Sequence, residues 1–237
     1  MRLARGTAEL RVYNDSVLPI RDVIPSRTTP FVTMALIAIN VAVFLAMPGS
    51  DTPEYEPFLR AWGLTPAAFT WPAVVTAMFV HAGFGHLFSN MLFLWIFGDN
   101  VEDRVGHLRF LVFYGLCGLA AALLQVGIER GSTVPMVGAS GAIAGVLGAY
   151  LIMFPQSRVL TFVFVTFLEV PASLLLGLWF ATQLLSGIGA LAVVRPEDMG
   201  GVAFWAHAGG FAAGASLVLL FRRPERMRVE WWDQVAG

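Results

Sequence analysis

The sequence contains no lysine, a single cysteine and few charged residues of either sign. Charged residues make up 13% of its 237 residues, whereas 57% are hydrophobic and the mean hydropathy is +0.71. A soluble globular domain carries about 25% charged residues, so this chain has too little charge to cover a surface that faces water. An intrinsically disordered chain is excluded as well, because such chains are poor in apolar groups. The composition predicts a protein of the lipid bilayer.

Other absences from the sequence exclude several kinds of site and partner. Cys117 is the one cysteine, so the chain can form neither an internal disulfide nor a cysteine cage for a metal. The net charge of −1 argues against nucleic acid as a partner. No HExxH string is present to bind zinc, and Asp99 has no aspartate in another predicted span to pair with. We therefore expect no metal and no other cofactor.

Six stretches are long and apolar enough to cross a bilayer, which takes roughly 20 residues. They cover residues 30–47, 74–98, 107–128, 138–154, 171–193 and 203–221. The stretch 159–168 is predicted to be a connector at the membrane interface. The expected fold is an all-α polytopic membrane protein, a six-transmembrane-helix bundle over residues 30–221. Residues 1–29 and 222–237 are expected to be cytoplasmic segments.

Arginine is distributed unequally between the two sides of this predicted bundle. Twelve arginines flank the spans on the side of the termini, and three flank them on the other side. Because cytoplasmic flanks carry the excess of basic residues, both termini are predicted to be cytoplasmic in a multi-pass protein of the cell membrane. The aromatic-rich segment 48–73 is then expected to lie in the headgroup region outside.

Polar side chains inside the predicted spans require an explanation, because hydrocarbon offers them no hydrogen-bond partner. Asn40, Gln125 and Gln183 are interpreted as hydrogen-bond links between helices. Thr29, which precedes Pro30, is predicted to cap the first span with its hydroxyl group.

Four other polar residues share one depth, since the second, fourth and sixth spans all begin at the outer face. His86 and Asn90 are four residues apart and lie on one helical face, Ser140 begins the fourth span and His207 begins the sixth. His81 lies about 140° around the helix from His86, so we expect it to have a different role.

This set of side chains permits acyl transfer. Ser140 is placed at a helix start, where free N–H groups can face a developing anion. His207 is suited to act as its general base, and His86 and Asn90 are suited to donate hydrogen bonds to an oxyanion together with the Ser140 N–H. Taken one by one, these residues are more often explained by packing or structural hydrogen bonds, and only their combination points to catalysis.

Three motifs resemble those of the rhomboid family of intramembrane serine proteases, and they follow one another along the chain in the family's order. The string GASG at 138–141 is similar to the family's GxSG motif, HLFSN at 86–90 resembles its HxxxN region with His81 upstream, and AHAGG at 206–210 is similar to its AHxxG segment. The similarity runs from about Thr29 to Phe221. One departure is RAW at 60–62, where the family often carries a Trp-Arg pair.

The resemblance implies the six-helix bacterial type and a catalytic dyad of Ser140 and His207 with no aspartate. It also implies an oxyanion site made by His86, Asn90 and the Ser140 amide, and cleavage of transmembrane protein substrates near the outer face. Two alternatives remain, a non-catalytic rhomboid-like scaffold that binds membrane proteins and, less readily, a proton-coupled transporter. Neither the substrate nor the oligomeric state follows from the sequence.

Glycines spaced by three and four residues line one face of the fourth and sixth spans. They are Gly141, Gly145 and Gly148 in the fourth span, and Gly210 and Gly214 in the sixth. Faces of small residues let membrane helices approach closely. These glycines are predicted to bring Ser140 and His207 within hydrogen-bond distance.

Overall fold

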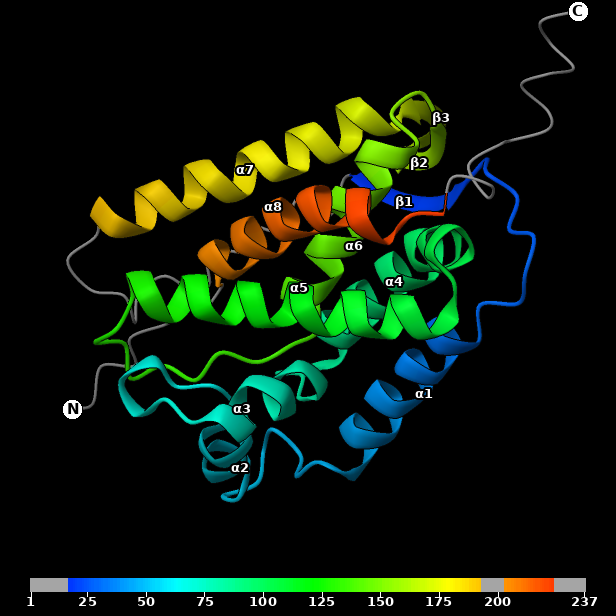
Figure 1. Cartoon of the computed structure of the whole chain (residues 1–237). Helices are drawn as coiled ribbons and strands as arrows, with labels where there is room; N and C mark the ends of the chain where they lie inside the picture. Colours follow the sequence, from blue (N-terminus) through cyan, green and yellow to red (C-terminus); the bar gives the residue numbers. More distant parts are fainter. Residues whose placement is uncertain (1–16, 193–202, 224–237) are drawn as a thin grey trace, which may run out of the picture.

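The computed structural model of the chain describes residues 17–192 and 203–223. This part is mostly helical, with helices packed around α6 (Ser140–Met153) and a small sheet at one end (Figure 1). The other elements are β1 (Val17–Asp22), α1 (Phe31–Ala46), α2 (Tyr55–Trp62), η1 (Pro66–Ala68), α3 (Trp71–Thr76), η2 (Ala77–Phe79), α4 (Phe84–Val105), α5 (His107–Ile128), β2 (Arg158–Val163), β3 (Thr166–Pro171), α7 (Ala172–Ala192) and α8 (Phe204–Phe221).

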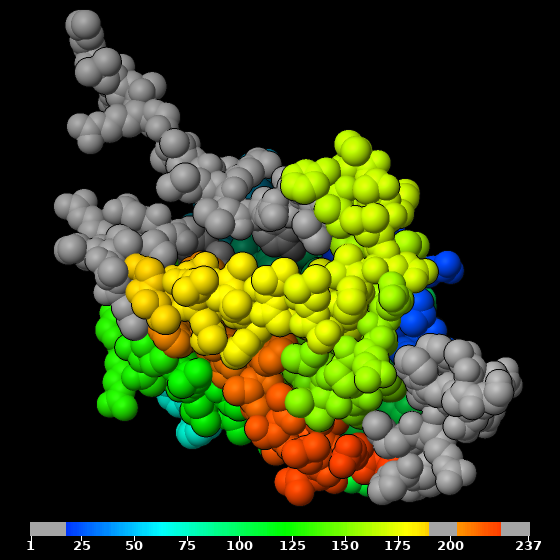
Figure 2. Space-filling view, turned by 90° about the horizontal axis from the view of Figure 1, so that it is seen from above, coloured from blue at the N-terminus to red at the C-terminus, as the bar shows by residue number. Residues whose placement is uncertain are grey.

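Helix α6 is the centre of the molecule, and eleven of its fourteen residues are buried. Helices α4, α5 and α8 pack against it (Figure 1). A helix that is apolar on all sides is stable only when other elements surround it. By contrast, α7 is an outer helix that lies across α8 on one face (Figure 2).

Three of the described helices, α5, α7 and α8, are long and apolar enough to cross a membrane. A fourth span results if the stretch 71–79 and α4 are taken as one, although the chain bends by 90° between them. The expected span over 74–98 is therefore not one continuous helix. α4 begins after this bend and continues beyond residue 98 to Val105. At 16 and 14 residues, α1 and α6 are shorter than the other apolar helices.

A three-stranded antiparallel sheet, in the order β1-β2-β3, corrects the all-α expectation. β2 and β3 form a hairpin that contains the predicted connector 159–168, and Val163 pairs with Thr166 at its tip. β1, from the N-terminal segment, pairs with β2. Val, Thr and Phe dominate β2 and favour an extended chain, but the partner strand lies about 140 residues away and leaves no local signal.

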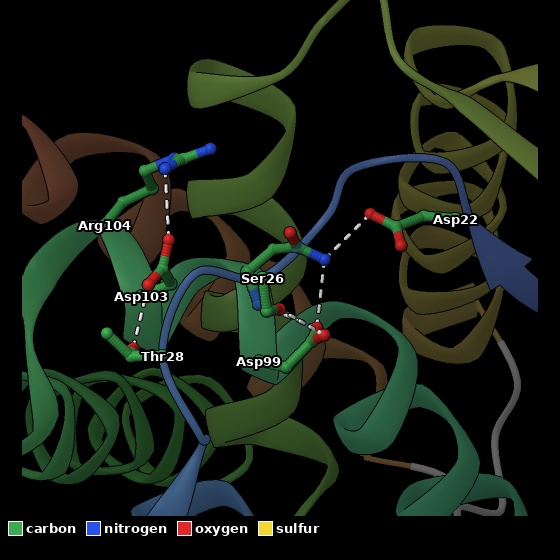
Figure 3. Close-up of polar contacts among 7 residues, drawn as sticks. Asp22, Ser26, Thr28, Asp99, Asp103 and Arg104 are labelled. Atoms are coloured by element: carbon green, nitrogen blue, oxygen red, sulfur yellow. Dashed lines mark hydrogen bonds and ion pairs between the residues drawn. The ribbon is translucent and has the colours of Figure 1, made fainter. Parts of the chain in front are cut away.

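A polar cluster fastens the N-terminal segment to the end of α4 (Figure 3). Three side-chain hydrogen bonds cross this contact: Ser26 Oγ to Asp99 Oδ2 at 2.7 Å, Thr28 Oγ1 to Asp103 Oδ1 at 2.8 Å, and Asn100 Nδ2 to Asp22 Oδ2 at 2.9 Å. The Tyr150 hydroxyl of α6 also donates to Asp22. Burial raises the pKa of Asp22 to about 7. The cluster thus joins β1, α4 and α6.

Glu102 takes the place of the predicted helix cap on α1. Its carboxylate accepts hydrogen bonds from the Val32 N–H at 3.0 Å and the Thr33 N–H at 2.7 Å. α1 begins at Phe31 and has no side-chain cap from its own flank, so the predicted Thr29 cap is wrong. The first N–H groups of a helix need acceptors, and here a carboxylate of α4 supplies them.

Candidate active site

Ser140 and His207 lie within hydrogen-bond distance, although they are 67 residues apart in the sequence. The distance from His207 Nε2 to Ser140 Oγ is 2.8 Å. Ser140 is the first residue of α6, and His207 lies in the first turn of α8. Both residues are half-buried. A serine hydroxyl beside an imidazole nitrogen is the arrangement of a nucleophile and its base.

His207 has a second polar partner that the sequence analysis did not assign to it. Its Nδ1 lies 2.7 Å from Oε1 of Gln183 on α7. Gln125 of α5 also reaches α8, where its Oε1 accepts a hydrogen bond from the Ala206 N–H at 3.0 Å. Both glutamines therefore join helices, as interpreted. Asn40 does not, because its Nδ2 donates to Leu36 O within α1.

The predicted glycine faces meet where α6 crosses α8. A Cβ atom on Gly210 would overlap the carbonyl oxygen of Gly141, and one on Gly214 would overlap that of Gly145. Gly148 lies in the same way against the carbonyl oxygen of Phe211. The two helix backbones are thus in direct contact close to the Ser140–His207 pair.

His86 and Ser140 both lie beside Gly138. A Cβ atom at Gly138 would lie 2.8 Å from His86 Nε2 and 3.8 Å from Ser140 Oγ. Gly138 has a φ of +117°, a conformation that glycine adopts readily and other residues rarely do. Asn90 is buried, and its Nδ2 donates to His86 O at 2.8 Å. His86 and Asn90 therefore share one face of α4 on the Ser140 side.

His81 is fully buried and contacts His86 instead of the Ser140–His207 pair. The two rings meet edge to face, with centroids 5.1 Å apart. The expected separation of about 140° around one helix is wrong, because His81 precedes α4, which begins at Phe84. A separate role for His81 stays a prediction.

The segment before Ser140 is held by the loop 48–73. Leu64 and Met136 exchange two backbone hydrogen bonds, of 2.9 and 2.8 Å, and the Ala67 N–H donates to Ser132 O at 2.9 Å. Arg60 Nη1 lies 3.5 Å from Thr133 O. This loop therefore braces the chain that leads into α6, a task that its aromatic composition alone did not indicate.

A small pocket opens beside Ser140. Apolar and small residues line it, among them Met78, Gly118, Ala121, Val137 and Gly138. A Cβ atom on Gly118 would lie 2.6 Å from the Met78 sulfur, so Met78 packs directly against the backbone of α5 at this glycine.

Residues 68–224, well over half of the chain, match the Rhomboid domain model. The chain belongs to the rhomboid family. With its apolar helices, this rhomboid is a multi-pass membrane protein.

Curated relatives come from several kinds of organism. This rhomboid is 31% identical over 186 residues to Rhomboid protein 1, mitochondrial, of Saccharomyces cerevisiae, an alignment covering 76% of the chain and 50% of that protein. It is 32% identical over 133 residues to Rhomboid protease GluP of Bacillus subtilis, an alignment covering 54% of the chain and 26% of that protein. It is 33% identical over 115 residues to Rhomboid-like protein 11, chloroplastic, of Arabidopsis thaliana, an alignment covering 46% of the chain and 38% of that protein. The chain spans half or less of the length of these three relatives.

Proposed function

We propose that this rhomboid is an intramembrane serine endopeptidase that cleaves transmembrane protein substrates near the outer face of the membrane. The observation that carries the proposal is the 2.8 Å hydrogen-bond distance between Ser140 Oγ and His207 Nε2 at the start of α6. The GluP relative, whose name identifies it as a rhomboid protease, supports the same reaction.

In the proposed reaction, Ser140 Oγ attacks the carbonyl carbon of the scissile peptide bond as His207 Nε2 takes the hydroxyl proton. The C–N bond then breaks, and His207 returns the proton to the leaving amine. A water molecule next attacks the acyl-enzyme, with His207 again accepting a proton. The bond from the carbonyl carbon to Ser140 Oγ then breaks, and His207 returns its proton to Ser140 Oγ as the carboxylic acid product leaves.

Negative charge develops on the substrate carbonyl oxygen during both attacks. The Ser140 N–H lies in the first turn of α6, where N–H groups have no intrahelical acceptor. We propose that this N–H stabilises the oxyanion together with the His86 ring and the Asn90 amide. Their shared face of α4, on the Ser140 side, supports these roles.

The short length of α6 supports a site below the membrane surface. Fourteen residues of helix span about 21 Å, less than the roughly 30 Å of hydrocarbon, so one end of α6 stops inside the bilayer. We propose that this is the Ser140 end and that α1 and α6 complete six transmembrane helices. The proposed location is the cell membrane, with both termini cytoplasmic, residues 30–221 as the membrane domain, and no cofactor.

Fluorophosphonate labelling of the purified full chain tests the proposal directly. We expect the wild-type chain to be labelled and to cleave a model transmembrane substrate. Ser140→Ala should lose both properties, while the matched control Ser216→Ala, which changes an exposed serine of α8, should keep both.

Two outcomes would overturn the proposal. Labelling that persists in Ser140→Ala would place the reactive nucleophile elsewhere. A folded wild-type chain that binds transmembrane proteins without labelling or cleavage would identify a non-catalytic scaffold.

A further inference from the structure

We infer that Gln183 of α7 is a positioning residue for His207, an inference that rests on the proposed protease function. Its side-chain carbonyl group holds the imidazole in the tautomer and orientation that a base for Ser140 requires. In a protein without a catalytic aspartate, this amide is the third member of the chain Ser140–His207–Gln183.

The argument begins with the two nitrogens of the His207 ring. Nε2 lies 2.8 Å from Ser140 Oγ, and Nδ1 lies 2.7 Å from Gln183 Oε1. A neutral imidazole has one donor and one acceptor nitrogen. Because Nε2 must accept the serine proton, Nδ1 must carry the hydrogen, and a carbonyl oxygen is the partner that such a donor needs. The direction of every hydrogen bond in this chain is then fixed.

The aromatic residues of α7 explain why Gln183 points at His207. Trp179 lies four residues earlier, on the same helical face, and its ring centroid is 5.8 Å from that of His207. Phe180 stacks on Phe211 of α8 at 4.3 Å. These contacts dock the middle of α7 on α8 and hold the Gln183 side chain over the imidazole. An amide on this apolar helix needs such a partner, because lipid provides none.

A neutral amide has an advantage over a carboxylate at this position. Burial of a negative charge is expensive unless the charge is fully paired, and the His207 ring is neutral before the reaction. During the reaction the ring becomes positively charged, and the Nδ1–H hydrogen bond to Gln183 becomes charge-assisted and stronger. Gln183 can therefore orient the base and also stabilise the imidazolium that forms.

Three substitutions in the full chain separate this role from packing. Gln183→Leu keeps the bulk of the side chain and removes the acceptor, Gln183→Glu keeps an acceptor oxygen, and Thr182→Val changes an exposed neighbour that hydrogen-bonds only to Trp179 O in this structure. We expect Gln183→Leu to lower kcat on the order of a hundredfold, the lower end of what a positioned general base contributes, with KM changed less than about twofold. Gln183→Glu, which keeps an acceptor oxygen but brings a charge, should lose less kcat than Gln183→Leu, and Thr182→Val should match the wild type.

Two kinetic results would overturn the inference. One is a Gln183→Leu kcat within about twofold of wild type. The other is an equal loss in Thr182→Val, which would indicate general docking of α7.

Nitrogen NMR of the full chain labelled with ¹⁵N-histidine reads the tautomer without any need for activity, and His207→Ala assigns the signal. We expect the Nδ1–H tautomer of His207 in the wild type and its loss in Gln183→Leu. An Nε2–H tautomer in the wild type would contradict the inference, even if the variants fold poorly. Full activity in Gln183→Leu with none in Ser140→Ala would overturn the role of Gln183 alone, whereas activity in Ser140→Ala would overturn the proposed protease mechanism itself.

Discussion

Gly138 meets two separate demands at one position. Its φ of +117° suits glycine, and the His86 ring occupies the space where a Cβ atom would lie. We expect Gly138→Ala to shift His86 or the start of α6 and to lower kcat/KM about a hundredfold, the cost typical of a misplacement near 1 Å. Substrate-cleavage kinetics measure this, with Gly131→Ala as the control because that glycine has open space around it. Equal activity in the two variants would contradict the prediction.

Asn90 should act on the transition state more than on substrate binding. In the proposed mechanism its amide meets charge that develops only during the reaction, so Asn90→Ala should lower kcat by the equivalent of about 3 kcal/mol and leave KM nearly unchanged. Asn40→Ala is the matched control, since that buried asparagine hydrogen-bonds within α1. A rise in KM with an unchanged kcat would exclude an oxyanion role for Asn90.

Asp22 should make the stability of this rhomboid depend on pH. Burial raises the pKa of its carboxyl group from 3.8 to about 7, so the folded chain binds the proton more tightly than the unfolded chain. The stabilisation is therefore complete below about pH 4 and is lost as the pH rises to about 7. Between about pH 5 and 8, the Tm in detergent should fall more steeply for the wild type than for Asp22→Asn. The exposed Asp51→Asn should follow the wild type, and parallel curves for all three chains would refute this role of Asp22.

Some residues of the site were predictable because their signals lie in the neighbouring sequence. A serine at a helix start, a histidine at the same depth in another span and glycines at helical spacing are visible along the chain. The partners of Gln183, Glu102 and β1 were not predicted, because each partner lies 24 to about 140 residues away. A lone polar residue in a span shows that it needs a partner but does not identify that partner.

At the scale of elements, the contact between α6 and α8 sets the separation of Ser140 and His207. We expect Gly210→Val to push α8 away from α6 and to lower kcat about a hundredfold or more, because the added Cβ overlaps the Gly141 carbonyl oxygen. Gly115→Val is the matched control, since that glycine of α5 has open space around it. Cleavage rates are compared at equal thermal stability. Equal losses in the two variants would show that this contact has no special part in the geometry of the pair.

Gly118 would be an unsuitable control for that comparison, although it also lies on α5. It lines the pocket beside Ser140 and contacts Met78. Sequence spacing alone places Gly118 outside the contact between α6 and α8. In the structure, Gly118 belongs to the site because η2 packs against α5 there and brings Met78 onto this glycine.

At the scale of the whole molecule, the loop 48–54 and the tip of the β2–β3 hairpin lie at opposite ends (Figure 1). The arginine distribution predicts that the hairpin is cytoplasmic. In a Cys117→Ala background, an impermeant maleimide should label Asp51→Cys in intact cells, and it should label Val165→Cys only after permeabilisation. Both sites are exposed in the structure, so labelling reports the side of the membrane. Labelling of both in intact cells would contradict the proposed orientation.

The contact between Gly210 and Gly141 also restricts which substitutions position 210 can tolerate. The atom that a Gly210 side chain would strike is a main-chain oxygen, which every amino acid carries, so no second mutation in α6 can make room. The Gly118 contact is of the opposite kind, because its obstacle is the end of the flexible Met78 side chain, and a smaller residue there would relieve it. A side chain at Gly118 can therefore be accommodated by shortening Met78, whereas a side chain at Gly210 requires the two helix backbones to separate.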